Sequence, residues 1–218
     1  GPKLKWIKSN LEDKIYLFTL LIISILLSVL IVKNFSSNFL INTILISSAL
    51  YLFFITLRDF FSKRFKNLAQ NTAHFGFSLL ILSILFNNLF STETITNLKV
   101  GETFENTKTK IVFENISQKE EKNYKSIIAK FIVQDSKGKI ENLSPELRIY
   151  NQPNIVTSEA DIKTTLLSDK FIVINLVQNQ EFFNVRYQVK PFMLWIWISV
   201  ILISIGGLLS FVKKEYEK

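Results

Sequence analysis

The chain has no cysteine and only one histidine among its 218 residues, and both shortages restrict its chemistry. Without cysteine it has no disulfide, no CxxC redox centre, no thiolate metal site and no cysteine nucleophile. A single histidine, His74, excludes a metal site built from several histidines of this chain and leaves no Ser-His-Asp triad for a soluble domain. The six glycines are scattered except for the pair Gly206 and Gly207, so a glycine-rich phosphate loop is absent as well.

The chain has an excess of positive charge, and this excess is unevenly distributed along the sequence. Lysine and arginine number 26 against 18 aspartate and glutamate, a net charge of +8. Residues 91–190 hold 14 basic and 13 acidic side chains, so nearly all of the excess lies elsewhere. The rest of the excess lies at the ends of long apolar runs, which is where membrane proteins carry basic residues. We therefore expect no nucleic-acid partner.

Long apolar runs account for a mean hydropathy of +0.26, which is unusual for a soluble domain. Runs of 18 or more nearly uncharged residues are long enough to cross a bilayer as helices. We predict three transmembrane helices in residues 1–90, at 15–32, 39–57 and 68–90, and a fourth at 191–212. The predicted fold class is a membrane all-α bundle of four transmembrane helices, with an extracytoplasmic mainly-β domain at 91–190 inserted before the last helix.

Basic residues orient these helices because cytoplasmic loops are enriched in lysine and arginine. Eleven of them precede the first run, join the second to the third, or follow the fourth, whereas Lys33 alone lies in the short loop opposite. The eleven are Lys3, Lys5, Lys8, Lys14, Arg58, Lys63, Arg64, Lys66, Lys213, Lys214 and Lys218. We predict both termini inside, 91–190 outside, and a cytoplasmic tail at 213–218.

Residues 91–190 show the pattern of a β domain. Apolar and polar residues alternate in KIVFENI and FNVRYQV, which indicates strands with one buried face. A small antiparallel sheet or sandwich is expected, although its strand order does not follow from the pattern. The predicted strands are 110–116, 126–134, 147–150, 171–177 and 181–189. Glu146 and Arg148 are interpreted as an ion pair in the turn before one of them.

His74 is the residue that most invites a functional interpretation, because an ionisable side chain in a membrane helix is costly and usually has a partner. Neutral imidazole is a common axial ligand of heme iron, and Gly76 nearby would let a flat ring approach the backbone. The alternative is a structural histidine bonded to a neighbouring helix or headgroup, which is the commoner case for such a residue alone. Ligation by two histidines would need one from another polypeptide or segment.

Several motifs occur together in the order typical of one family. They are AHFG at 73–76, PELRIY at 145–150, TSEADI at 157–162, and WIW at 195–197 followed by Gly206 and Gly207. With the predicted topology, they make the chain resemble the C-terminal part of CcmF, the cytochrome c-type biogenesis proteins that act in heme attachment. The resemblance implies that His74 is an axial ligand of a transmembrane b heme, and Gly76, two residues further along the same motif, is predicted to belong to the cofactor-binding site.

The resemblance also implies what the chain works with. The family's tryptophan-rich WWD motif and second transmembrane histidine lie N-terminal to the matching region, so a C-terminal fragment or one product of a split protein is expected. The implied function is as a component of a cytochrome c heme lyase that is not active alone. The implied partners are the heme chaperone CcmE, CcmH/CcmI-type proteins, apocytochrome c and the remaining N-terminal part of CcmF.

The implied location is a bacterial or mitochondrial inner membrane, with the β domain facing the periplasm or the intermembrane space. The alternative function is a membrane-anchored β-domain module for binding or assembly, without heme. A transporter is disfavoured because no apolar run is broken and none has an acidic residue in its middle.

Overall fold

The computed structural model describes residues 11–33, 35, 38–61, 68–136, 138–177 and 181–216. The chain divides into two compact units, one of helices (1–90 and 192–218) and one of strands (91–191). Several basic residues used for the topology prediction, among them Lys63, Arg64 and Lys66, lie outside the described residues. Each unit is considered by itself below.

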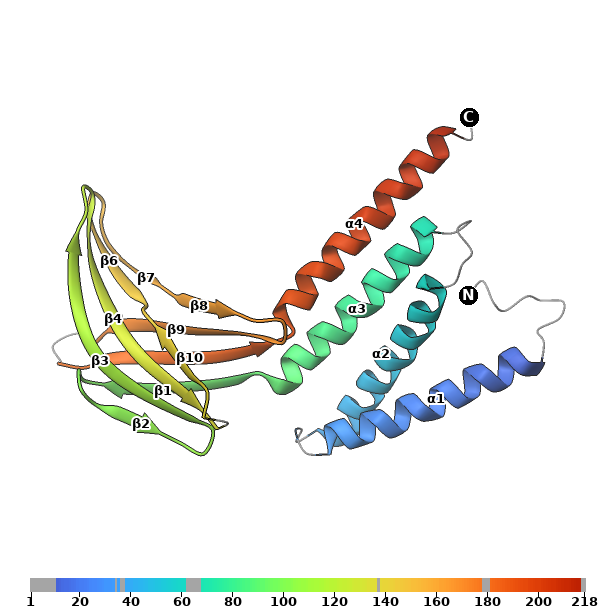
Figure 1. Ribbon diagram of the computed structural model, residues 1–218, viewed down its shortest axis with the longest axis horizontal. Helices are drawn as coiled ribbons and strands as arrows, with labels where there is room; N and C mark the ends of the chain where they lie inside the picture. The colour runs from blue at the N-terminus through green and yellow to red at the C-terminus, as the bar shows by residue number, and fades with distance from the viewer. Residues whose placement is uncertain are drawn as a thin grey trace. The chain divides into compact units, whose positions relative to one another are not determined.

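Four helices form the first unit: α1 (Leu11–Val32), α2 (Phe39–Phe60), α3 (Leu68–Phe90) and α4 (Met193–Tyr216). Each has a segment long and apolar enough to span a membrane, as the sequence predicts. Their serine and threonine hydroxyls donate to carbonyls one turn back, as Ser24 does to Leu20 at 2.8 Å, so these polar groups are satisfied within the helix. Helices neighbouring in sequence pack side by side, with α3 between α2 and α4 (Figure 1).

The last helix begins later than predicted. Pro191 ends a β-strand, where it pairs with Ser168, and α4 starts at Met193. Phe192 joins the two with a positive φ of 60°, a conformation that a side chain of this size rarely adopts. The strand thus continues almost to the helix. The prediction started the helix at 191 because the apolar run begins there, and hydropathy does not reveal where the backbone pairing of a strand stops.

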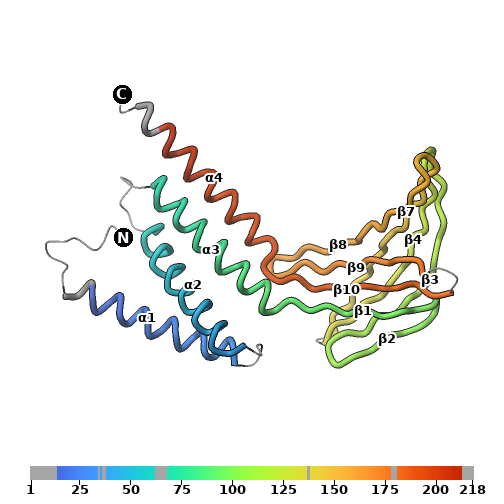
Figure 2. The backbone as a smooth tube through the Cα atoms, turned by 180° about the vertical axis from the view of Figure 1, so that it is seen from behind, coloured from blue at the N-terminus to red at the C-terminus, as the bar shows by residue number. Residues whose placement is uncertain are grey.

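Ten antiparallel strands form the second unit (Figure 2). One sheet has the order β1-β10-β9-β8, and the other β2-β3-β4-β6-β7 with β5 also paired to β4. The strands are β1 (Thr92–Leu98), β2 (Thr103–Glu105), β3 (Thr109–Glu120), β4 (Tyr124–Asp135), β5 (Ile140–Leu143), β6 (Glu146–Asn151), β7 (Asn154–Glu159), β8 (Asp161–Thr164), β9 (Ser168–Leu176) and β10 (Phe183–Pro191). Glu146 and Arg148 therefore lie within β6, not in a turn before it.

The core of this unit comes from alternate positions of the long strands. Ile111 and Phe113 of β3, Phe131 of β4, and Ile172 and Ile174 of β9 are at most 1% exposed. The rings of Phe113 and Phe131 stack with centroids 4.4 Å apart. Two-residue periodicity places these side chains on one face of each strand, which confirms the predicted antiparallel domain with a buried face.

Candidate functional site

His74 lies on an exposed face of α3. Exposed side chains on this helix include Gln70, His74, Phe77, Ile84 and Asn88, separated by three, four or seven positions, so they share one face. Within the described ranges His74 makes no hydrogen bond, and its whole surrounding segment is apolar enough to span a membrane. A polar ring in that setting requires a partner that the described part of this chain does not supply.

The flank of α3 next to α2 is held by polar contacts. The hydroxyls of Thr56 and Ser78 are 2.5 Å apart and both side chains are buried. Near the start of α3, the Asn71 amide donates to the Asp59 carbonyl at 2.7 Å. Hydrogen bonds between helices have few competing partners in an apolar environment. They fix α3 against α2 at two heights, one on either side of His74 in the sequence.

The other flank of α3 is held by glycine contacts with α4. A Cβ atom at Gly76 would meet the Ile203 nitrogen at 2.9 Å, and one at Gly206 would meet the Ala73 nitrogen at 2.6 Å. Both distances are shorter than real Cβ contacts, so the two backbones approach as closely as glycine allows. Gly207 has no neighbour within 4 Å of such an atom. Gly206 thus contacts the residue immediately before His74.

The two residues singled out in the AHFG motif therefore face different surroundings. His74 is exposed, whereas Gly76 is buried against α4. Gly76 can influence a ligand of His74 only by setting the position of α3, since its own surface is occupied by Ile203 and Leu202. The pair Gly206 and Gly207 predicts close helix packing from the sequence, but adjacent glycines in an apolar helix look alike until the facing helix is known, so the sequence does not reveal that Gly206 makes the contact.

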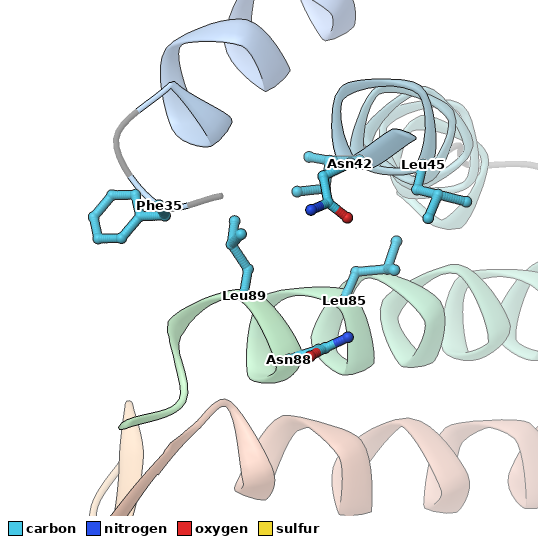
Figure 3. A pocket seen from close by; sticks show the side chains of 7 residues that line it. Phe35, Asn42, Leu45, Leu85, Asn88 and Leu89 are labelled. Carbon is cyan, nitrogen blue, oxygen red and sulfur yellow. The ribbon is translucent and has the colours of Figure 1, made fainter. Parts of the chain in front are cut away.

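A separate cavity lies where α2 begins and α3 ends. It has a volume of about 190 Å³ and is lined by Phe35, Asn42, Leu45, Ile46, Leu85, Asn88 and Leu89 (Figure 3). Asn88 is 14 positions from His74, roughly 21 Å along the helix at 1.5 Å per residue. The cavity is consequently not part of the surroundings of His74.

In the β domain, the PELRIY motif builds a small polar cluster on β6 and β4. The Arg148 Nε lies 3.1 Å from the Glu146 carboxylate, which also accepts from the Ser126 hydroxyl at 3.0 Å. The hydrogen bond that the Arg148 guanidinium donates to the Glu146 carboxylate raises the pKa of Arg148. The guanidinium lies 5.3 Å from the ring centroid of Tyr124, and the Tyr124 and Tyr150 rings are also 5.3 Å apart. The predicted ion pair is confirmed, with an aromatic neighbour that the sequence pattern does not indicate.

These features define an integral membrane protein with a two-sheet β domain between its third and fourth helices. Residues 89–191 match the family described as CcmF C-terminal beta-sandwich. The chain is also similar to the cytochrome c-type biogenesis protein CcmF of Pseudomonas aeruginosa, with 26% identity over 145 residues that cover 66% of this chain and 22% of that protein. The cytochrome c-type biogenesis protein ccl1 of Rhodobacter capsulatus is 35% identical over 95 residues, which cover 44% of this chain and 14% of that protein.

A solved structure, that of the cytochrome c heme lyase CcmF, has the same fold. It superposes with a TM-score of 0.68 at 19% identity and covers 95% of this chain and 36% of that one. The resemblance seen in the motifs is confirmed by the match of residues 89–191 to this family model and by the similarity of the chain to CcmF proteins. It spans about a fifth of the length of the curated relatives with which it aligns over 145 residues.

Proposed function

We propose that this chain is the C-terminal part of a cytochrome c heme lyase and that His74 is one axial ligand of a transmembrane b heme. The observation that carries the proposal is the placement of His74, an exposed imidazole in an apolar span on a helix fixed along both flanks. The face around it fits a flat, mainly apolar ring, since Phe77 and Ile84 are exposed on it.

Under this proposal, the residues of this chain bind the heme and hold its ligand in position. His74 presents a neutral nitrogen to iron, while the contacts of α3 with α2 and α4 hold that nitrogen at one height and direction. A b heme bound here supplies one-electron redox chemistry, whose potential depends on the second ligand and on the dryness of the site. That second ligand belongs to the remaining N-terminal part of the protein. The chain itself needs no nucleophile.

The experiment is a visible absorption spectrum of the detergent-purified protein together with the remaining N-terminal part. A low-spin b-heme spectrum supports the proposal. A protein that is fully assembled but colourless contradicts it and favours the alternative, a membrane-anchored β-domain module for binding or assembly. That alternative has its own support in the cluster of Arg148 and its aromatic neighbours.

The proposed location is an inner membrane, with both termini inside and the β domain outside. Reporter fusions after Phe90 and after the C-terminal Lys218 are expected to report opposite sides of the membrane, because basic residues are enriched in the segments assigned to the inner side. A fusion within the 33–38 loop is a matched control and should agree with the one after Phe90. The same side for Phe90 and the C-terminus would contradict this topology.

The β domain is proposed as the docking surface for the maturation partners CcmE, CcmH/CcmI-type proteins and apocytochrome c. Arg148→Ala is expected to lower holocytochrome yield several-fold while leaving any b-heme spectrum unchanged, because β6 is a strand of the β domain and His74 is in a spanning helix. The Arg148–Glu146 ion pair is only partly buried and remains in contact with solvent, so thermal stability should hardly change.

The control for Arg148 is Lys108→Ala, which removes an exposed positive charge elsewhere in the domain. Holocytochrome yield is measured by heme staining, and stability by thermal unfolding of the purified protein. Equal yields from the two variants would argue against a docking role for Arg148. A large loss of stability in Arg148→Ala alone would instead assign the residue to the structure of the sheet.

A further inference from the structure

We propose that the turn between β8 and β9 is a membrane contact, in which Leu166 and Leu167 insert into the interface of the bilayer leaflet on the side of the β domain. The side chains of these adjacent leucines are 61% and 64% exposed. They are the two residues between Thr165 and Ser168 at the end of a hairpin. This contact does not depend on heme, so it can be tested separately from the role of His74.

The turn is closed without any help from the leucine side chains. The Thr165 N–H donates to the Ser168 carbonyl at 3.0 Å, the Thr165 hydroxyl donates to the same carbonyl at 2.7 Å, and the Ser168 N–H donates to the Thr165 hydroxyl at 3.1 Å. Such tips normally contain Gly, Asn, Asp, Ser or Pro, each for a conformational reason. Two leucines serve no such purpose here, and in water they leave apolar area unburied.

Strand register places this turn at the end of the sheet that leads into the membrane helices. Ser168, the next residue, pairs with Pro191 at the end of β10, and Thr92 at the start of β1 pairs with Val189. Figure 2 shows the β8–β9 turn beside the end of β10. One end of this sheet therefore carries both chain connections to spanning helices and the leucine turn.

The distance to the membrane helix follows from connectivity. Consecutive Cα atoms are 3.8 Å apart and paired strands about 5.5 Å, so the Cα of Leu167 lies within roughly 10 Å of that of Pro191. Pro191 is two residues before Met193, the first residue of α4. The interfacial layer on each side of the hydrocarbon is roughly 5–8 Å thick. The leucines are thus within reach of that layer.

The chemistry of the neighbouring residues fits a lipid surface. Trp195 and Trp197 lie in the first turns of α4, where tryptophan favours the interface. Lys163, exposed in β8 beside the turn, can reach phosphate headgroups while the leucines contact acyl chains. A short apolar tip with a basic neighbour is the pattern expected for a surface that lies on a membrane.

The test uses spin labels, for which this cysteine-free chain needs no background substitutions. Leu167→Cys is labelled with a nitroxide in the full 218-residue chain, reconstituted singly into phosphatidylcholine nanodiscs. Leu176→Cys is the matched control: it is 48% exposed and lies at the other end of β9, paired with Phe183. The label at 167 is expected to collide readily with oxygen. Its collisions with a water-soluble nickel complex are expected to be several-fold less frequent than those of the control label at 176.

Equal nickel accessibility at the two positions would overturn the proposal, because it would place the turn in water. Low accessibility of the 167 label to both oxygen and nickel would overturn it as well, since it would mean that protein covers the turn. Leu166→Cys is a second variant that must give the same result as Leu167→Cys. Far-UV circular dichroism should match the unsubstituted chain for all three variants.

Discussion

His74→Ala in the assembled protein is expected to abolish or strongly reduce the absorption spectrum of the b heme. Removing an axial imidazole leaves the iron with an open position, and His74 is the only histidine in the chain. Loss of a group that merely hydrogen-bonds to a metal ligand costs about 10–100-fold in affinity, so loss of the ligand itself should cost at least as much. The measurement is the heme-to-protein ratio and the low-spin spectrum of the purified protein.

The control is Gln70→Ala, which truncates a polar side chain one helical turn away on the same exposed face. It should retain the spectrum. Added imidazole should partly restore a low-spin spectrum to His74→Ala, because the space left by the side chain has the size of the ligand. A full bis-imidazole spectrum in His74→Ala would show that the histidine is structural.

Gly206→Leu is expected to have the second largest effect, by forcing α4 away from α3. The first side-chain carbon would lie 2.6 Å from the Ala73 nitrogen and 2.9 Å from the Ala69 carbonyl oxygen, and backbone atoms cannot rotate aside. Overpacking of this kind costs typically about 1–3 kcal/mol. Because Ala73 precedes His74, the displacement also moves the imidazole, so we expect lower thermal stability together with a lower heme content.

Gly207→Leu is the matched control, since it makes the same chemical change one residue away, where nothing lies within 4 Å. It should leave stability and heme content close to those of the unsubstituted protein. Gly76→Leu should resemble Gly206→Leu, because its Cβ would meet Ile203 and Leu202 of α4. If Gly206→Leu and Gly207→Leu behaved alike, the close approach of α3 and α4 would not position the histidine.

The helices could be predicted from the sequence because membrane crossing depends on length and hydropathy, which are local properties. The predicted end at Leu57 extends in the structure to Phe60, since Arg58 and Asp59 are charged but remain helical. The guanidinium of Arg58 lies 4.2 Å from the ring centroid of Tyr16 on α1, so its charge is accommodated by a contact between helices. Hydropathy alone therefore predicts the end of the helix too early at such a residue.

The strands were harder to predict, because pairing depends on partners far away in the sequence. The long strands β3, β4, β9 and β10 were recognised by alternation, whereas β1 (TETITNL) is mostly exposed and lacks an apolar face. β1 is nevertheless a strand because it pairs with β10 along its whole length, from Thr92 with Val189 to Leu98 with Phe183. Close packing at Gly76 and Gly206 could be predicted, but not that the two glycines face each other's helices, because that depends on which faces of α3 and α4 are in contact.

The glycine contact between α3 and α4 also imposes an order in time on the making of the protein. The two helices are separated by the entire β domain, about a hundred residues of chain. At translation rates of about 5–20 residues per second, α3 waits roughly 5–20 s for the helix that packs against Gly76. During this interval His74 is held on the α2 side only. Its final position is therefore set only after the β domain has been synthesised.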